Sequence, residues 1–434
     1  MSVLSKLLSK AVRKGRLQVT FPDGSIETFG SEPGPEVAIR IKDPSFARRI
    51  ALNPELVAAE AFMDEALVVE NPKSGTGAWE LLEIFFLNKR HFDLTPSQIF
   101  WRGVARGAKR FMQHNPVSRA RQNAKHHYDL GNDLYRLFLD RGMQYSCAYY
   151  PDGDETLEEA QQKKMRHIAA KLCLKPGQRV LDIGCGWGGL GLYLASVEDV
   201  EVVGVTLADE QLKVAQARVE AMGLSDRVRF ELRDYRDVTE SFDRVVSVGM
   251  LEHVGITSLT GYHLSVRDRL KPGGAALIHS ISTKAPPGVT GPFIRKYIFP
   301  GGYAPSVSES VQAVEKSGLW ITDMEVWRVH YAKTLREWRR RFEAERPQIE
   351  AMYDERFARM WEFYLAACEG VFEYGASMVY QMQLTRERDD VPLHRDYIQE
   401  EEARFAAKEP AFMEALMASA ETALGDPARG EAAA

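Results

Sequence analysis

The sequence predicts an α/β fold, in which helices cover both faces of a parallel sheet, with a small α+β domain at the N-terminus. Three observations support this prediction. Apolar, β-branched segments alternate with helical segments from about residue 126 onward. A cluster of glycines, from Gly184 to Gly189, follows the first of these strands. Short strand patterns separated by turn residues occupy residues 17–41. The chain of 434 residues is long enough for two domains.

The N-terminal region has the pattern of a small mixed domain. Strands are expected at 17–21, 25–29 and 37–41, with a turn at Pro22-Asp23-Gly24 between the first two. A helix is expected from about Pro54 to Met63. We therefore predict an α+β domain over residues 1–90.

Basic residues are concentrated in two segments of this part of the chain. Residues 94–128 contain no acid but seven basic residues: Arg102, Arg106, Lys109, Arg110, Arg119, Arg121 and Lys125. In the first sixteen residues, four apolar residues lie along one helical face: Leu4, Leu7, Leu8 and Val12. Anionic bilayers attract basic amphipathic segments. We predict a basic helical connector over 91–125 and association of residues 1–90 with an anionic membrane surface. A solvated linker face and a helix packed on a sister subunit are the alternatives.

The alternating region predicts a Rossmann-like catalytic domain over residues 126–390. Strands are expected at 179–184, 201–207, 228–233, 242–249 and 275–282, and further strands near 321–327 and 378–385. Helices are expected near 188–196, 209–222 and 258–270. A segment rich in proline, glycine and aromatic residues, 283–305, follows the fifth strand and is expected over the ligand crevice. Residues 391–434 are expected to form a charged helical tail.

The composition excludes several classes of protein. The net charge of −5 gives no general attraction to nucleic acid. The sequence contains no run of 18 apolar residues, so no membrane-spanning helix is expected. The N-terminus also lacks the apolar core of a signal peptide. The four cysteines form no CxxC pair, which favours a reducing cytoplasm. We therefore expect a cytoplasmic protein with no nucleic-acid partner and no metal.

The glycine cluster predicts an adenosine-type cofactor. Gly184, Gly186 and Gly189 match the G-x-G-x-x-G pattern of dinucleotide-binding folds, but the second strand, 201–206, ends without the acid that would hold a dinucleotide ribose. Instead, Asp182 precedes the first glycine, which is the placement used by S-adenosylmethionine methyltransferases. Asp234, after the third strand, is suitably placed to accept a hydrogen bond from an adenine amino group. We predict a class I, Rossmann-like S-adenosylmethionine-dependent methyltransferase, with a dinucleotide site or a purely structural turn as alternatives.

Six further motifs extend this prediction. They occupy residues 127–135, 145–150, 248–255, 277–281, 299–302 and 330–335. In this order and spacing they resemble the cyclopropane fatty acid synthase family, which includes the mycolic acid cyclopropane synthases. The resemblance covers about residues 17–386 and is strongest from 126 to 340.

The resemblance implies a reaction at a double bond. The family transfers the methyl group of S-adenosylmethionine to a cis double bond of an acyl chain, commonly on a phospholipid. The resulting carbocation loses a proton from the new methyl group to a bound bicarbonate, and a cyclopropane ring closes. By motif, the residues expected to hold bicarbonate are Cys147, Glu252, His279, the backbone of Ile281, and Tyr331, with Tyr128 near the reacting centre. Those expected to hold the cofactor are Tyr145, Ser146, Asp182, Gly184, Cys185, Gly186, Gly188, Thr206, Leu207, Gln211, Asp234 and Tyr235.

The residue types fit this chemistry, with one difficulty and several alternatives. A thiol, an imidazole and a phenol can each hydrogen-bond an oxyanion, and an aromatic face such as that of Tyr128 can stabilise a cation. Glu252 would repel bicarbonate unless one of the two carries a proton. Cys147 could instead fill the core or act as a nucleophile. Cys368 matches a family cysteine, although core packing is favoured over catalysis.

The product and the assembly also have alternatives. The same methyl transfer could leave a methylene-branched or methylated alkene chain. The non-enzyme alternative is a lipid-binding protein that retains the fold. The resemblance suggests a homodimer, and we expect a protein that is peripheral on the inner face of the membrane.

Overall fold

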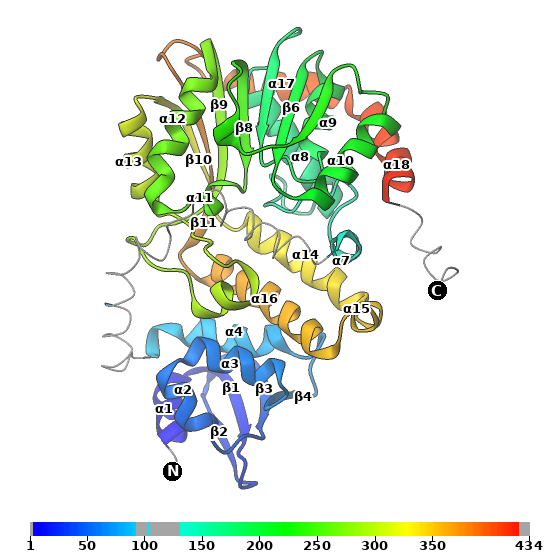
Figure 1. Cartoon of the computed structure of the whole chain (residues 1–434). Helices are drawn as coiled ribbons and strands as arrows, with labels where there is room; N and C mark the ends of the chain where they lie inside the picture. Colours follow the sequence, from blue (N-terminus) through cyan, green and yellow to red (C-terminus); the bar gives the residue numbers. More distant parts are fainter. Residues whose placement is uncertain (1–2, 93–102, 104–130, 425–434) are drawn as a thin grey trace. The chain divides into compact units, whose positions relative to one another are not determined.

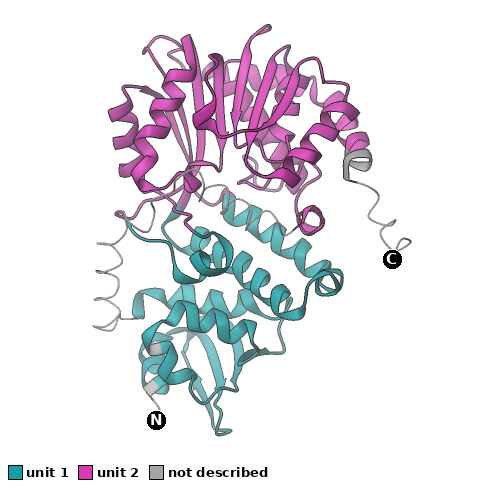
Figure 2. Cartoon of the chain, in the orientation of Figure 1, with its two compact units in different colours: residues 1–112, 288–300, 331–377 teal, residues 113–287, 301–330, 378–434 magenta. Residues whose placement is uncertain are grey.

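The protein is described here from a computed structural model, which defines residues 3–92, 103 and 131–424. The chain divides into two compact units (Figure 2). Unit 1 comprises residues 1–112, 288–300 and 331–377. Unit 2 comprises residues 113–287, 301–330 and 378–434. Both units are therefore built from segments that are distant in the sequence.

Unit 2 contains a seven-stranded sheet with the order β10-β11-β9-β8-β5-β6-β7 (Figure 1). Its strands are β5 (Arg179–Ile183), β6 (Glu201–Thr206), β7 (Val228–Leu232), β8 (Phe242–Val248), β9 (Leu270–Thr283), β10 (Trp320–Trp327) and β11 (Ser377–Thr385). The central strands β5 to β9 pair in parallel, whereas β10 and β11 are antiparallel to each other. The α/β prediction is confirmed, and every expected strand is present. The largest difference in this sheet is at β9, which begins five residues earlier than expected, at Leu270.

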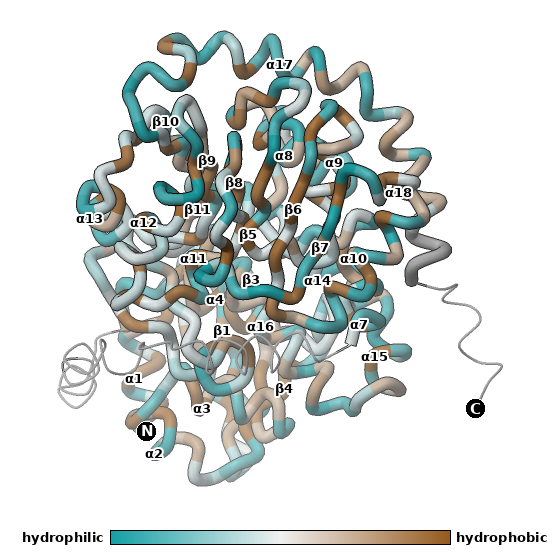
Figure 3. Tube along the Cα trace, turned by 45° about the horizontal axis from the view of Figure 1, so that its top comes forward, coloured by the Kyte–Doolittle hydropathy of each residue, from teal (hydrophilic) through white to brown (hydrophobic). Residues whose placement is uncertain are grey.

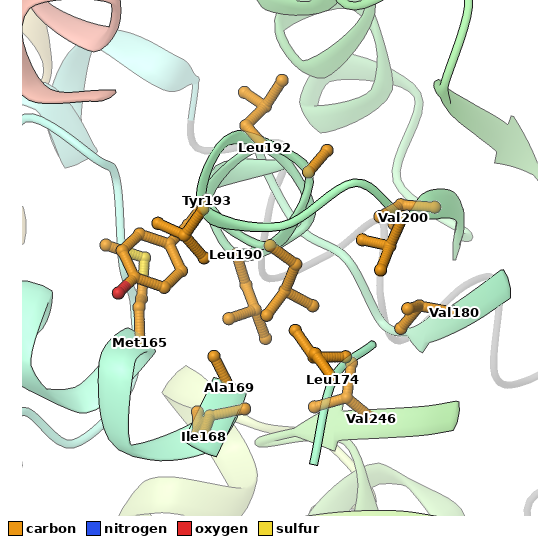
Figure 4. Packing of buried hydrophobic residues seen from close by; sticks show 14 of the residues in the cluster. Met165, Ile168, Ala169, Leu174, Val180, Leu190, Leu192, Tyr193, Val200 and Val246 are labelled. Carbon is orange, nitrogen blue, oxygen red and sulfur yellow. The ribbon is translucent and has the colours of Figure 1, made fainter. Parts of the chain in front are cut away.

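Helices cover both faces of this sheet, because side chains on both faces of its strands are apolar and buried. In β5, Val180 contacts one apolar cluster, while Leu181 and Ile183 contact the other. The first cluster includes residues of α8 (Leu157–Lys171), α9 (Gly189–Val197) and α10 (Asp209–Ala221), and part of it is shown in Figure 4. The second includes residues of α11 (Leu251–Val254), α12 (Leu259–Arg269) and α13 (Val307–Ser317). The strand β6, for example, is apolar along most of its length (Figure 3).

The C-terminal helices belong to unit 2 and do not form a separate tail. They are α17 (Asp396–Ala406) and α18 (Glu409–Leu424). Ile398, Phe405, Phe412 and Leu416 are buried in the first apolar cluster. The charged residues that suggested a tail lie between these apolar positions, as is usual for an amphipathic helix on a core.

Unit 1 is built on a four-stranded sheet with the order β2-β1-β3-β4. Its strands are β1 (Lys14–Thr20), β2 (Ile26–Phe29), β3 (Glu32–Ile41) and β4 (Leu67–Glu70). Its helices are α1 (Val3–Ala11), α2 (Phe46–Leu52), α3 (Pro54–Met63), α4 (Ala78–Asn88), α14 (His330–Ala344), α15 (Arg346–Met352) and α16 (Glu355–Tyr374), with short turns η1 (Lys89–His91) and η4 (Ile294–Ile298). The predicted strands and the helix at 54–63 are present, whereas β4 and α4 were not predicted.

Helix α16 completes the core of unit 1, although it lies far along the chain. It packs against α3 and α4. A Cβ atom at Gly370 would lie only 2.1 Å from the Phe86 ring, so this position allows α4 to approach closely. The Glu362 carboxylate accepts hydrogen bonds from the backbone N–H groups of Thr76 and Ala78 at the start of α4. The predicted domain boundary at residue 90 therefore does not match the boundaries of unit 1. Helices α3 and α4 of the first 90 residues pack against α16, so α16 belongs to the same unit.

Most of the apolar face of α1 is buried within unit 1. Leu4, Leu8 and Val12 are at most 9% exposed, whereas Leu7 is partly exposed. The connector predicted over 91–125 lies almost entirely outside the described residues. Among the helices that the structure describes, none is long and apolar enough to cross a bilayer. Polar side chains therefore make up most of the exposed surface of α1.

Candidate active site

The predicted site residues of unit 2 gather at one edge of its sheet. β5, β6, β8 and β9 run in parallel, so the loops that follow them meet at their carboxyl ends. The register pairs Val248, the last residue of β8, with His279 in β9. Glu252 follows β8 in the short helix α11. This edge therefore brings together the glycine loop, Glu252 and His279.

The loop after β5 has space and unpaired groups for a ligand. Asp182 is 2% exposed, and its Oδ2 has no hydrogen-bond partner within the described chain. Burial raises the pKa of this carboxyl to about 7. Gly186 has a left-handed backbone (φ 53°), and no atom lies within 4 Å of a Cβ built there. α9 begins directly after this loop, so its first N–H groups face the same region. The loop is thus suited to a ligand with hydrogen-bond donors and a polar, partly anionic group.

A second loop, residues 141–147, packs against the start of α9. A Cβ atom at Gly189 would lie 2.5 Å from the backbone carbonyl oxygen of Gly142, so this contact requires glycine. Two side chains of α8 hold the loop. Lys164 Nζ donates to Gln144 Oε1 (2.7 Å) and Ser146 Oγ (2.8 Å). Gln161 Nε2 donates to the carbonyls of Gln144 (3.1 Å) and Ser146 (3.0 Å). Four hydrogen bonds from α8 therefore hold this loop in place.

Lys164 is a site residue that the sequence analysis did not identify. Its side chain is fully buried, and burial lowers its pKa to about 8. Asp140, Cys147 and Asp182 partly offset this shift by their charge. The same ammonium also lowers the pKa of His279. The sequence does contain a signal for Lys164. Gln161 and Lys164 lie on the same face of α8 as the buried Leu157 and Ile168, and polar residues are uncommon on a buried helix face.

The remaining predicted cofactor residues lie on the neighbouring loops. Thr206 ends β6, and Gln211 is buried in the first turn of α10. Tyr145 packs edge-to-face against Tyr135, with ring centroids 5.2 Å apart. Leu207 is partly buried, Cys185 is buried beside the glycines, and Tyr235 is buried after β7.

Asp234 is already engaged by a neighbouring side chain. Its carboxylate accepts from Arg236 Nε (2.8 Å) and Arg236 Nη2 (2.6 Å). An adenine amino group at this carboxylate would therefore share it with Arg236.

Glu252 is a buried acid with one unused oxygen. Its Oε1 accepts from the backbone N–H of Ile281 (2.5 Å), while Oε2 has no partner among the residues described. Burial raises the pKa of this carboxyl to about 7, although the hydrogen bond from Ile281 opposes the shift. Near neutral pH, Glu252 therefore carries a proton part of the time and can donate a hydrogen bond from Oε2.

His279 presents a donor in the same region. Gln381 Nε2 faces His279 Nδ1 at 3.3 Å, and an amide nitrogen can only donate, so Nδ1 accepts. Burial keeps the pKa of His279 well below its usual value, so the ring is neutral and its proton lies on Nε2. In the described part of the chain, Nε2 has no partner. Glu252 and His279 thus offer two buried donors without protein acceptors.

The other predicted catalytic residues fall into three groups. Cys147 is buried in the 141–147 loop and donates to the Ala148 carbonyl at 3.3 Å. The backbone of Ile281 is already engaged: its N–H donates to Glu252, and its carbonyl accepts from Ser280 Oγ at 3.0 Å. Tyr331 and Cys368 belong to unit 1, where Tyr331 packs on Phe372 and burial raises the pKa of Cys368 to about 12. Tyr128 lies outside the described residues.

Aromatic residues that the sequence analysis also missed support His279. Trp327 packs edge-to-face against its ring at 5.1 Å, and Tyr149 stacks on Trp327 at 4.6 Å. Tyr149 also stacks on His167, which lies 2.7 Å from both Glu325 and Glu402. These ring contacts hold the His279 side chain in one orientation.

Comparisons with known proteins identify close relatives. The family model for mycolic acid cyclopropane synthetase matches residues 116–382, and a model for a domain of unknown function matches residues 3–90. The cyclopropane-fatty-acyl-phospholipid synthase of Escherichia coli K12 is 42% identical over 80% of this chain and 87% of its own length. Tuberculostearic acid methyltransferase of Mycobacterium tuberculosis is 34% identical over 89% of this chain and 91% of its own.

Solved structures give the same result. A cyclopropane synthase from Mycobacterium tuberculosis superposes with a TM-score of 0.59 at 32% identity, over 62% of this chain and 98% of its own. A mycolic acid cyclopropane synthase complexed with SAH and CTAB has a TM-score of 0.57, also at 32% identity, over 62% of this chain and 99% of its own. The class I methyltransferase fold is confirmed.

The buried carboxyl of Asp182 should make stability depend on pH. Its pKa is raised in the folded state, so the folded protein binds more protons than the unfolded chain and loses stability as the pH rises towards 7. Asp182→Asn removes this loss. We therefore compare the free energies of unfolding of the variant and the wild type. The difference, variant minus wild type, should increase by up to about 1.4 kcal/mol for each pH unit as the pH rises from about 4 to 7. Urea unfolding at several pH values measures this difference.

Asp243→Asn is the matched control with the opposite sign. Hydrogen bonds from Arg179 and Lys271 lower the pKa of Asp243, so its removal should cost more stability at neutral than at acidic pH. If the Asp182→Asn difference does not change with pH, the buried carboxyl is not responsible for the dependence.

Proposed function

Because the chain belongs to the mycolic acid cyclopropane synthetase family, we propose that it transfers the methyl group of S-adenosylmethionine to a cis double bond of a phospholipid acyl chain and closes a cyclopropane ring. The chain is an S-adenosylmethionine-dependent methyltransferase by family and fold. The observation that best supports the finer proposal is the pair of buried donors, on Glu252 and His279, at the sheet edge that also holds the glycine loop.

The glycine loop and the loop 141–147 are the proposed cofactor site. S-adenosylmethionine supplies an electrophilic methyl group when bound. Asp182 Oδ2 accepts a hydrogen bond from the ligand, which satisfies an acid that is otherwise buried without a partner. The N–H groups at the start of α9 and the open space at Gly186 accommodate polar ligand atoms. Ser146, held by Lys164, fixes the second wall of the site.

Glu252 and His279 are the proposed holders of a small oxyanion. Bicarbonate at this position supplies a base. The repulsion expected between Glu252 and bicarbonate is removed when Glu252 carries a proton, which its raised pKa permits. His279 donates from Nε2, and Cys147 lies buried in the loop 141–147 of the same unit. The family resemblance implies Tyr331, a residue of unit 1, as a further holder. Within unit 2, the buried Glu252 and His279 offer the anion a site from which water is excluded.

A second product remains a candidate because of one relative. A tuberculostearic acid methyltransferase matches 89% of this chain. The first step, methyl transfer to an acyl double bond, is common to both products. The proton is then lost either from the new methyl group, which closes a ring, or from a chain carbon, which leaves a methylated alkene; a hydride shift before proton loss leaves a methylene branch.

We further propose that the protein works in the cytoplasm, peripheral on the inner face of the membrane, as a homodimer. The phospholipid substrate requires access to a bilayer, and basic residues of the predicted connector attract an anionic surface. The family resemblance supports the dimer.

Product analysis tests the proposed reaction. The purified protein is incubated with S-adenosylmethionine that carries a fully deuterated methyl group and with vesicles of an unsaturated phospholipid. Ring closure should add one CD2 unit, because one deuteron leaves the new methyl group, and the product should resist mild hydrogenation. Mass spectrometry of the lipid measures both properties. Addition of CD3 in place of hydrogen identifies a methylated alkene, and a CD2 product that takes up hydrogen identifies a methylene branch. An unmodified lipid contradicts methyl transfer.

Glu252→Ala should separate turnover from cofactor binding. Alanine offers the anion no donor and removes the acceptor of the Ile281 N–H, so turnover should fall by about a hundredfold. The affinity for S-adenosylmethionine should change less than about threefold, because Glu252 is not assigned to the cofactor. Kinetics and calorimetry measure the two quantities, and Glu231→Ala, the same change on β7, is the control. Equal losses in turnover and affinity would refute the assigned role.

A further inference from the structure

Unit 1 contains a basic pocket that the proposed reaction does not use. The pocket has a volume of about 360 Å³ and is lined by Ser9, Lys10, Arg13, Arg90 and His91. Ser9 and Lys10 lie in the last turn of α1, Arg13 follows that helix, and Arg90 and His91 lie in η1. Segments almost eighty residues apart therefore contribute their basic side chains to one hollow.

The basic groups of this pocket have no acidic partner in the described part of the chain. Within the residues described, no carboxylate forms an ion pair with Lys10, Arg13, Arg90 or His91. Several other arginines of unit 1 have close partners, although Arg16 and Arg48 have none among the residues that the structure defines. Arg356 lies 2.7 Å from Asp64, and Arg346 Nη1 lies 2.6 Å from Glu362. The pocket therefore presents positive charge to an external anion.

The pocket has a rigid frame. Asn88, at the end of α4, is fully buried. Its Oδ1 accepts from the backbone N–H groups of Arg13 (2.8 Å) and Lys14 (2.9 Å). Its Nδ2 donates to the carbonyls of Lys14 and Ile84, both at 2.8 Å. One amide thus ties the chain after α1 to the helix that precedes η1, and it fixes the distance between Arg13 and Arg90.

We propose that this pocket binds the phosphate of a phospholipid head group. Guanidinium groups pair with phosphate oxygens in a bidentate manner, and the Ser9 hydroxyl, the Lys10 ammonium and the His91 ring add donors for the remaining oxygens. This inference rests on the proposed function and extends it, because it names the part of the lipid that unit 1 recognises.

Neighbouring aromatic rings favour a lipid over free phosphate. Phe92 directly follows His91, and its ring packs on Phe85 with centroids 5.1 Å apart. Phe85 is 38% exposed. Partly exposed phenylalanine rings beside basic groups fit a surface that meets the membrane interface, where apolar side chains lie at the level of the head groups. Since most of the apolar face of α1 is buried, the polar end of this helix and η1 supply the contact.

Vesicle binding tests the pocket without any measurement of methyl transfer. The pocket variant is Arg13→Gln with Arg90→Gln. The matched control is Lys6→Gln with Arg16→Gln, which removes the same charge from exposed positions of unit 1 outside the pocket. Sedimentation uses vesicles of phosphatidylcholine with phosphatidylglycerol at physiological salt. The pocket variant should bind at least about tenfold more weakly than wild type, and the control should change less than about threefold. Thermal unfolding verifies that both variants are folded.

Two results would overturn the proposal. Equal losses in the two variants would mean that diffuse charge, not the pocket, attracts the vesicles. Titration with inorganic phosphate provides the second arm. If the pocket variant loses phosphate binding but keeps vesicle binding, the site takes free phosphate and not a lipid. Because neither measurement depends on turnover, an enzyme that is inactive on lipid leaves this test unchanged.

Discussion

The candidate active site depends on one buried ammonium group. Lys164 is fully enclosed in unit 2, where a charge is costly unless hydrogen bonds and opposite charges compensate it. Gln144 and Ser146 supply the hydrogen bonds, and Asp140 and Asp182 supply the charge. The position of the loop 141–147 follows from these bonds. Since that loop also packs on Gly189 at the start of α9, the two loops assigned to the cofactor are positioned together.

Burial then gives the acids and the imidazole of this site unusual protonation states. The carboxyls of Asp182 and Glu252 have raised pKa values because their charged forms lose water, and His279 is held neutral for the same reason. Each of the three also has one polar atom without a partner in the part of the chain that the structure describes. Because buried polar atoms are rarely left unsatisfied, this arrangement is suited to ligands that complete the hydrogen bonding. Deprotonation beside a transient cation needs such a dry, donor-lined space.

The sequence predicted the sheet well because its strands are continuous apolar runs between clear turn residues, as in β5 and β6. It named Asp182, Glu252 and His279 as candidate site residues because they lie within or just after strands, in recognisable motifs. Lys164 and Gln161 were missed because a helix pattern does not show which polar residue faces the core. The role of α16 in unit 1 was missed because a contact such as that of Gly370 with Phe86 joins residues almost 300 positions apart.

Calorimetric titration of S-adenosylmethionine tests the central claim, that the Lys164 ammonium holds the cofactor site in place. The titration compares wild type, Lys164→Met and Lys163→Met, whose side chain lies on the same helix but pairs with Asp152 and Glu155. Lys164→Met should bind at least about tenfold more weakly, because two charge-assisted hydrogen bonds are lost. Lys163→Met should bind like wild type, and circular dichroism should show that both are folded. Wild-type affinity in a folded Lys164→Met protein, or no binding by the wild type, would contradict this account.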